Sequence, residues 1–286
     1  MNELREKGLG LAAVSYDSPQ ILAAFSKQRA ITFPLLSDVG SVTIKRYGIL
    51  NPVPEWAMGP DKDDPVVQAE VQKYVSVGRP SPQMVGIAFP GTFILDRQGR
   101  VTSRYFEDFY IERNTVSSIM IRLGSKAGAV AATKISSGQL DITTYPSDSA
   151  IAPGNRLSIA LDVTPHAGIH VYAPGARNYR VIELNMAPQP FVRTLPMKYP
   201  ASQIYFFKPL NESVQVYQGP FTLVQEVILE GTPQAQAAFR DKDSVTIGGA
   251  LEYQACDDSI CYNPTSVPLS WTLMLRRIIR ERPTLP

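Results

Sequence analysis

The chain has few cysteines and lacks both long apolar runs and basic clusters. Its only two cysteines are Cys256 and Cys261, so no residue before position 256 can take part in thiol chemistry. No apolar run approaches the roughly 20 residues of a membrane-spanning helix, and residues 1–5 lack the basic-then-apolar order of a signal peptide. The 28 Lys and Arg nearly balance the 26 Asp and Glu, and no basic run could follow a phosphate backbone. We therefore expect no membrane span in this chain and no nucleic-acid partner.

The composition is that of a folded protein with more than one domain. Hydrophobic residues make up 44% of the 286 residues and charged residues 19%, which argues against a disordered chain. A single hydrophobic core usually stops growing near about 250 residues. We therefore expect two domains.

Residues 1–123 alternate strand and helix signals, which is typical of an α/β domain. Ser18 and Pro19 can cap a helix and occupy its first position. Two apolar runs, 87–96 and 101–106, are separated by a tight turn and predict a hairpin. Residues 51–85 are rich in Pro and Gly, and we expect a loop insertion with one helical turn near Val66–Tyr74.

The end of this domain and the linker after it are predicted from periodicity and composition. Val116, Ile119, Met120 and Leu123 recur at helical spacing, and we expect this helix to lie on the sheet of the first domain. Residues 124–138 are mostly small and polar and predict a linker.

Residues 139–278 predict an all-β domain. Short segments alternate apolar with polar residues and are separated by Pro and Gly, which is typical of an antiparallel sandwich. The inward-facing positions predicted from this alternation are Leu157, Ile159, Leu161, Val163, Phe221, Leu223, Val227, Val245, Ile247, Leu251, Tyr253, Leu269, Trp271 and Leu273.

The two cysteines flank a predicted turn and can lie on paired strand ends, where Cα atoms approach the roughly 5.5 Å that a disulfide needs. A disulfide that closes about six residues stabilises the fold by only about 2 kcal/mol. This spacing favours a redox-active pair, although a structural bridge remains the alternative. Asp257 and Asp258 lie between the thiols and should raise the cysteine pKa values, which suits a pair that exchanges a disulfide within a docked complex.

A metal site is the less favoured interpretation of the histidines. His166 and His170 are four residues apart, but Pro165 and Gly168 place them on a loop, and zinc prefers a tighter cysteine spacing. We expect His170 to pack against Tyr172 at a strand end. The sequence has no phosphate-binding glycine loop and no serine nucleophile elbow, so we expect neither a metal nor a cofactor.

The first domain resembles the redoxin branch of the thioredoxin fold, the AhpC/TSA group. The matching segments are 11–18 (LAAVSYDS), 33–38 (FPLLSD), 47–49 (YGI) and 89–100 (FPGTFILDRQGR). The resemblance implies a cis Pro90 that faces an active-site thiol. The family's first core strand and catalytic cysteine would precede Met1, so the resemblance implies a thioredoxin-like domain incomplete at its N-terminus. Because this domain has no cysteine, we do not expect peroxidase activity.

The second domain resembles the N-terminal domain of the thiol:disulfide interchange protein DsbD. The matching segments are 168–174 (GIHVYAP), 214–219 (VQVYQG), 253–256 (YQAC), 261–262 (CY) and 267–270 (VPLS). The resemblance implies an immunoglobulin-like sandwich whose cysteine pair passes electrons to partner proteins under an aromatic cap loop. The spacing departs from the family, because four residues rather than five separate the cysteines.

The resemblance also implies the functional residues and their partners. Cys256 and Cys261 would be catalytic, and the supporting residues would be Pro90, His170, Tyr172, Tyr253 and a cap near Tyr205, Phe206 and Phe207. The partner would be a thioredoxin-fold or DsbD-like redox protein in a periplasmic or other extracytoplasmic compartment. The alternative function is a non-catalytic binding sandwich with a structural disulfide and an inactive redoxin scaffold.

Overall fold

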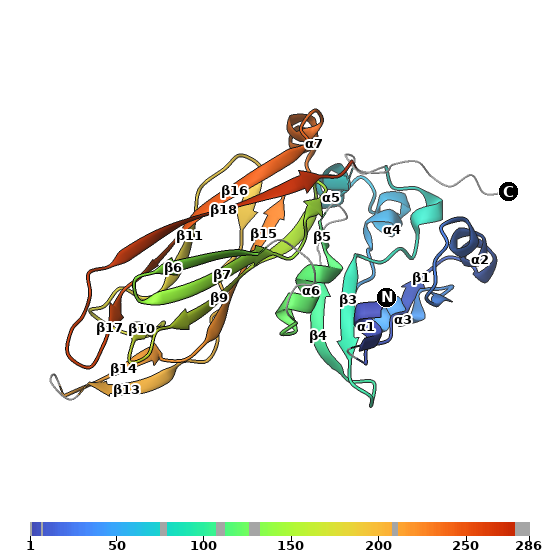
Figure 1. Cartoon of the computed structure of the whole chain (residues 1–286). Helices are drawn as coiled ribbons and strands as arrows, with labels where there is room; N and C mark the ends of the chain where they lie inside the picture. The colour runs from blue at the N-terminus through green and yellow to red at the C-terminus, as the bar shows by residue number, and fades with distance from the viewer. Residues whose placement is uncertain are drawn as a thin grey trace. The chain divides into compact units, whose positions relative to one another are not determined.

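The computed structural model describes residues 2–6, 8–74, 79–106, 112–125, 132–207 and 211–277. The chain divides into two compact units, and the boundary lies between residues 111 and 112 (Figure 1). None of the helices in the described ranges is long and apolar enough to cross a membrane.

The first unit combines short helices with two strand pairs, as the α/β prediction requires. Strands β1 and β2 pair in parallel, whereas β3 and β4 form the predicted antiparallel hairpin. The hairpin turn is fixed by Asp96, whose carboxylate accepts the backbone N–H groups of Gln98 and Arg100. The elements in chain order are α1 (Asn2–Glu6), β1 (Ala13–Ser15), α2 (Pro19–Gln28), β2 (Leu35–Ser37), α3 (Val42–Arg46), α4 (Val53–Met58), α5 (Pro65–Tyr74), a 3₁₀ turn (Pro82–Met84), β3 (Gly91–Leu95) and β4 (Val101–Phe106).

The predicted start of α2 is confirmed, whereas the predicted loop over residues 51–85 is wrong in part. Ser18 accepts a hydrogen bond from the backbone N–H of Ile21, and Pro19 occupies the first turn of α2. The loop region instead contains α4 and the ten-residue α5. Asn51 and Asp64 accept backbone N–H groups at the starts of these helices, so polar side chains rather than apolar periodicity mark them.

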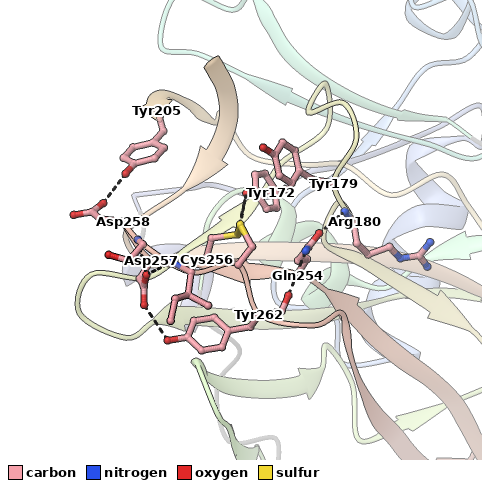
Figure 2. Close-up of a disulfide and its surroundings, with 12 residues drawn as sticks. Tyr172, Tyr179, Arg180, Tyr205, Gln254, Cys256, Asp257, Asp258 and Tyr262 are labelled. Atoms are coloured by element: carbon pink, nitrogen blue, oxygen red, sulfur yellow. Dashed lines mark hydrogen bonds between the residues drawn. A yellow bond between two sulfur atoms is a disulfide. The ribbon is translucent and has the colours of Figure 1, made fainter. Parts of the chain in front are cut away.

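The second unit is built of β-sheets around one apolar core, in agreement with the predicted sandwich. Its described strands form the sheets β12-β15-β9-β7-β6, with β5 on the side of β9, then β11-β16-β18-β8 and β13-β14-β10-β17. The third sheet carries Cys256, which Figure 2 shows in close-up. The strands are β5 (Arg113–Asn114), β6 (Thr133–Ser137), β7 (Leu140–Pro146), β8 (Ala150–Ile151), β9 (Asn155–Pro165), β10 (His170–Tyr172), β11 (Glu183–Met186), β12 (Val192–Thr194), β13 (Gln203–Phe207), β14 (Glu212–Tyr217), β15 (Phe221–Leu229), β16 (Ser244–Tyr253), β17 (Ala255–Cys256) and β18 (Thr265–Leu275).

The core of this unit is made of the residues that alternation predicted. Leu161, Leu223, Ile247 and Leu273 are completely buried, and they belong to one cluster with the other predicted inward-facing residues. Phe221 and Val245 are only partly buried and pack on its border. The helix α7 (Pro233–Phe239) adds Phe239 to the cluster.

The helix α6 (Val116–Arg122) lies on the second unit, so the prediction that it covers the sheet of the first domain is wrong. The strand β5 before it pairs in parallel with β9, and Ile121 packs against Tyr145 and Ala160. The predicted apolar stripe is also only partly correct, because Val116 is 58% exposed. The second unit therefore begins before position 123. The strand β6 also occupies residues 133–137 of the predicted linker, while residues 126–131 lie outside the described ranges.

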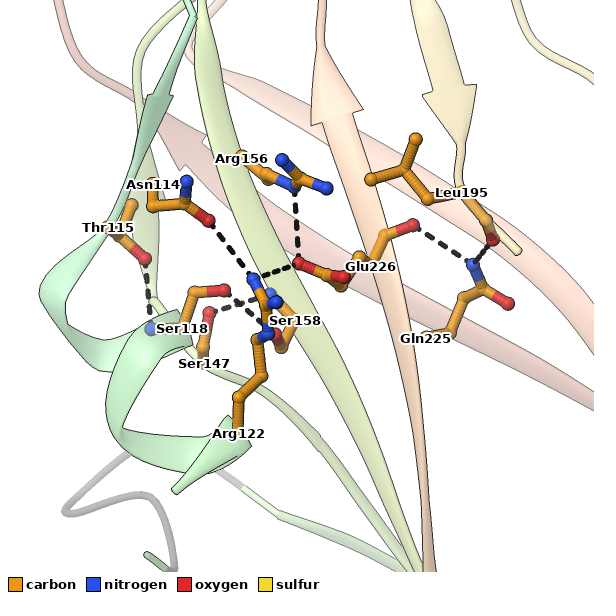
Figure 3. Close-up of polar contacts among 10 residues, drawn as sticks. All are labelled: Asn114, Thr115, Ser118, Arg122, Ser147, Arg156, Ser158, Leu195, Gln225 and Glu226. Atoms are coloured by element: carbon orange, nitrogen blue, oxygen red, sulfur yellow. Dashed lines mark hydrogen bonds and ion pairs between the residues drawn. The ribbon is translucent and has the colours of Figure 1, made fainter. Parts of the chain in front are cut away.

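Polar side chains explain why α6 belongs to the second unit (Figure 3). Ser118 and Ser158 share a hydrogen bond of 2.8 Å, and both are completely buried. The Glu226 carboxylate, 6% exposed, binds Arg122 from α6 at 2.5 Å and Arg156 from β9 at 3.1 Å. A buried carboxylate requires such partners, and the guanidinium of Arg122 therefore fixes α6 on β9 and β15.

We expect Glu226→Gln to lower the free energy of unfolding of the second unit by about 3 kcal/mol, because two guanidiniums lose their shared carboxylate. Urea unfolding followed by Trp271 fluorescence measures this change in a Trp56→Phe background, where Trp271 is the remaining tryptophan. Glu183→Gln removes an exposed carboxylate and is the control. Equal unfolding midpoints for the two variants would contradict the role assigned to Glu226.

Candidate functional site: the Cys256–Cys261 disulfide

Cys256 and Cys261 form a disulfide across a tight hairpin, as expected from their spacing. Their Cα atoms are 4.1 Å apart, which is closer than the roughly 5.5 Å that is typical of a disulfide. The backbone N–H of Asp257 donates to Ile260, and that of Tyr262 donates to Ala255, at 2.9 and 2.8 Å. The cysteines lie between these two hydrogen bonds, at a non-hydrogen-bonded position of an antiparallel pair, where Cα atoms approach most closely.

The two cysteines differ in exposure. Cys256 is 1% exposed, because β17 pairs with β10 and places Cys256 opposite His170 within the sheet. Cys261 lies on the returning arm of the hairpin and is exposed. Attack by a thiolate needs access to one sulfur. The structure therefore presents Cys261 to an incoming thiol and protects Cys256.

Two stacked tyrosines cover the buried sulfur. The Tyr172 hydroxyl lies 2.9 Å from Sγ of Cys256 and 3.5 Å from Sγ of Cys261 (Figure 2). Tyr179 stacks on Tyr172 with ring centroids 4.0 Å apart, and its hydroxyl donates to Glu212 at 2.9 Å. Burial raises the pKa of Tyr172. Its hydroxyl therefore stays protonated at neutral pH and can donate a hydrogen bond to sulfur.

His170 lies on the same face and packs among the aromatic rings. Its ring centroid is 4.5 Å from that of Tyr205 and 5.6 Å from that of Tyr172. The side chain is 2% exposed, and this burial lowers the pKa of His170. His166 instead contacts Asp141, with 3.4 Å between Nε2 and Oδ1. Within the described ranges, no group of three or more His, Cys, Asp or Glu could hold a metal ion.

Both acidic residues between the cysteines are held by hydrogen bonds. Asp257 accepts the backbone N–H groups of Ser259 and Ile260 and the hydroxyl of Tyr262, which together lower the pKa of Asp257. Asp258 accepts the hydroxyl of Tyr205 at 2.5 Å. The loop between the cysteines therefore carries a fixed negative charge.

The structure brings only some of the expected cap residues to the disulfide. Tyr205 reaches the cysteine loop, and the ring of Phe207 lies 6.4 Å from that of Tyr205. Phe206 is 50% exposed, because successive residues of β13 point to opposite faces of the sheet. Residues 208–210, which follow the expected cap, lie outside the described ranges.

Tyr253 does not lie beside the sulfur atoms, and Pro90 differs from the implied cis conformation. Tyr253 is completely buried in the main core, where its hydroxyl donates to the Ser137 carbonyl at 2.9 Å. Pro90 belongs to the first unit, and its peptide bond is trans, so the implied cis bond is wrong. A trans X–Pro bond is favoured by about 0.5–1 kcal/mol. The cis isomer would need tertiary contacts that outweigh this preference, and those of the first unit do not.

Sequence patterns did not identify Tyr179, Glu212 or Gln254 as part of this site. Tyr179 follows Tyr172 after a turn, and Glu212 comes from the neighbouring strand β14. Gln254 accepts the backbone N–H of Arg180 and donates to the carbonyl of Tyr262. It therefore links the Tyr179 segment, residues 173–182, to the hairpin that carries the cysteines. The sequence feature that points to them is the group of tyrosines near His170, and this group does not show which tyrosines contact one another or the sulfurs.

The comparisons with known proteins confirm both resemblances. Residues 1–104 match the AhpC/TSA family, and residues 143–268 match the family "Thiol:disulfide interchange protein DsbD, N-terminal". These matches and the disulfide indicate a thiol-disulfide redox function. Among curated proteins, none matches the chain.

Two solved structures show weak similarity. The N-terminal periplasmic domain of ScsB from Proteus mirabilis is 16% identical, with 49% of this chain and 51% of that chain covered and a TM-score of 0.36. This chain thus covers about half of that solved chain. The GAE domain of GGA2p from Saccharomyces cerevisiae is 12% identical, with 52% of this chain and 99% of that chain covered and a TM-score of 0.24.

The buried His170 should make the second unit sensitive to mild acid. Its folded-state pKa is lowered from 6.5, so the unfolded chain binds the proton more readily. Its contribution to stability is therefore complete above pH 6.5 and falls as the pH drops below that value. We expect His170→Phe, which keeps an aromatic ring, to lose less stability than the wild type between pH 7 and 5. Urea midpoints from Trp271 fluorescence measure this, and identical pH profiles would contradict it.

Proposed function

We propose that this chain exchanges disulfides with a thioredoxin-fold or DsbD-like protein through Cys256 and Cys261. The observation that carries the proposal is the unequal exposure of the two cysteine residues, with Tyr172 beside the sulfur of the buried one. The match to the DsbD N-terminal family supports the same conclusion. Because disulfides persist in oxidising compartments, we also propose an extracytoplasmic location.

The exchange follows from the geometry of the pair. A partner thiolate attacks Sγ of Cys261 and forms a mixed disulfide, while the bond to Cys256 breaks and its electron pair passes to Sγ of Cys256. The Tyr172 hydroxyl donates a hydrogen bond to this new thiolate. A second partner thiolate then attacks the mixed disulfide, which oxidises the partner and leaves both cysteines reduced. The reverse sequence oxidises the pair.

Single-cysteine variants test the assignment. In Cys256→Ser the exposed Cys261 should form a stable mixed disulfide with a thioredoxin-fold protein that keeps one active-site cysteine, activated as its thionitrobenzoate mixed disulfide: Cys261 displaces thionitrobenzoate, and neither protein then has a second cysteine to resolve the adduct. In Cys261→Ser the buried Cys256 should form little of this adduct. Non-reducing gels and mass spectrometry measure both yields. Equal yields, or a reduction potential below about −300 mV for the wild-type pair, would contradict the exchange proposal.

The alternative function is a binding sandwich with a structural disulfide. In that case Cys256→Ala with Cys261→Ala should lower stability by about 2 kcal/mol and leave partner binding intact, with no electron transfer to lose. The exchange proposal instead expects binding to persist while electron transfer is lost.

Tyr172→Phe should slow reduction of the disulfide by a small thiol about tenfold, because the Cys256 thiolate loses a hydrogen bond to a charged acceptor, worth about 1.5 kcal/mol or more. Tyr145→Phe removes a hydroxyl bound to Asp162 elsewhere in the unit and is the control. Rates are measured by quenching with an alkylating reagent. A wild-type rate for Tyr172→Phe would show that the hydroxyl does not act on the leaving sulfur.

A further inference from the structure

The four-residue loop between the cysteines carries two carboxylates that hydrogen bonds hold in place. Asp257 and Asp258 occupy the first two of its four positions. Asp257 is held by the backbone N–H groups of Ser259 and Ile260, at 2.7 and 2.6 Å, and Asp258 by the hydroxyl of Tyr205 (Figure 2). Neither carboxylate can turn away from the loop without losing these hydrogen bonds.

The surrounding charges leave this region negative in the described part of the chain. Arg180 is paired with Glu252, and the exposed Arg177 lies on the Tyr179 segment rather than on the loop. Glu212 adds a carboxylate next to Tyr179. His170 faces the disulfide, but it is buried among aromatic rings and neutral at neutral pH. No described contact therefore neutralises both Asp257 and Asp258.

We infer that Asp257 and Asp258 select the thiols that reach Cys261, disfavouring anionic small thiols such as glutathione and favouring protein thiols in positively charged surroundings. The attacking group is a thiolate, so further negative charge on its carrier increases repulsion. One unit charge roughly 6 Å away in water changes such a rate about threefold. The inference rests on the proposed function, because it defines the class of thiol that enters the same exchange.

The selected step is the attack on Cys261. The thiolate forms a bond to Sγ of Cys261, and the electron pair of the broken bond passes to Sγ of Cys256. A second thiolate then releases the first as a small-molecule disulfide, so two thiols are oxidised for each disulfide reduced. The carboxylates take no part in bond making, and they act only through their charge.

The experiment compares three small thiols on the full chain: cysteamine, which is cationic, 2-mercaptoethanol, which is neutral, and 3-mercaptopropionate, which is anionic. Each thiol's rate of reducing the protein disulfide is measured at equal thiolate concentration. It is then divided by the rate at which the same thiol reduces a neutral model disulfide, which corrects for differences in nucleophilicity between the thiols. We expect the wild type to prefer cysteamine over 3-mercaptopropionate. Asp257→Asn with Asp258→Asn should reduce this ratio about a hundredfold at most, which is about tenfold for each of the two units of charge by which the thiols differ, and high salt should reduce it in the wild type.

Asparagine keeps the Oδ1 acceptor that Ser259, Ile260 and Tyr205 use, whereas the hydrogen bond from Tyr262 to Oδ2 of Asp257 meets an amide group instead. Asp241→Asn with Asp243→Asn is the control: it makes the same charge change beside α7, far from β17 within the unit (Figure 1). This control should keep the wild-type ratio. Equal ratios for wild type and the Asp257 and Asp258 variant would overturn the inference. If no thioredoxin-fold protein exchanges with the chain but the ratio changes as expected, the proposed partner is wrong and the selectivity stands.

Discussion

The site depends on the pairing of β17 with β10. This short antiparallel contact puts Cys256 opposite His170 and brings its sulfur to the Tyr172 hydroxyl. The hairpin then turns back through four residues, so Cys261 bonds to Cys256 without entering the sheet. Cys256 is therefore buried beside a hydrogen-bond donor, while Cys261 is an exposed residue. A disulfide between two equally buried cysteines would offer no point of attack.

The same sheet explains how polar groups can surround a buried sulfur with little loss of folding free energy. Its inner face, with Val171, Ala255 and Tyr217, joins the main core. The opposite face carries Tyr172 and Cys256 under the segment that contains Tyr179. The tyrosine hydroxyls there reach sulfur or carboxylates, so the aromatic cover combines apolar packing with satisfied hydrogen bonds. The negative charge gathers at the hairpin, where the exposed sulfur lies.

Alternation along the strands predicted the sandwich core well. One face of each sheet packs against the core, so every second residue of a strand must be apolar. The position of α6 could not be predicted in this way. The apolar residues of α6 could pack on either unit. The choice depends on two polar contacts: Arg122 binds Glu226, 104 residues further along the chain, and Ser118 binds Ser158, 40 residues further along. Likewise, Asn51 and Asp64 accept backbone N–H groups at the starts of α4 and α5, in a region without clear periodicity.

The sequence by itself determined that thiol chemistry is confined to Cys256 and Cys261, that two carboxylates lie between them, and that an α/β region precedes a β-sandwich. These properties follow from composition, spacing and local alternation. The tertiary structure decided which cysteine is accessible, that Tyr172 contacts the sulfurs, and that Phe206 is exposed while Tyr253 lies in the main core. Exposure and side-chain contacts depend on strand pairings between distant segments, and local sequence patterns do not record which segments pair.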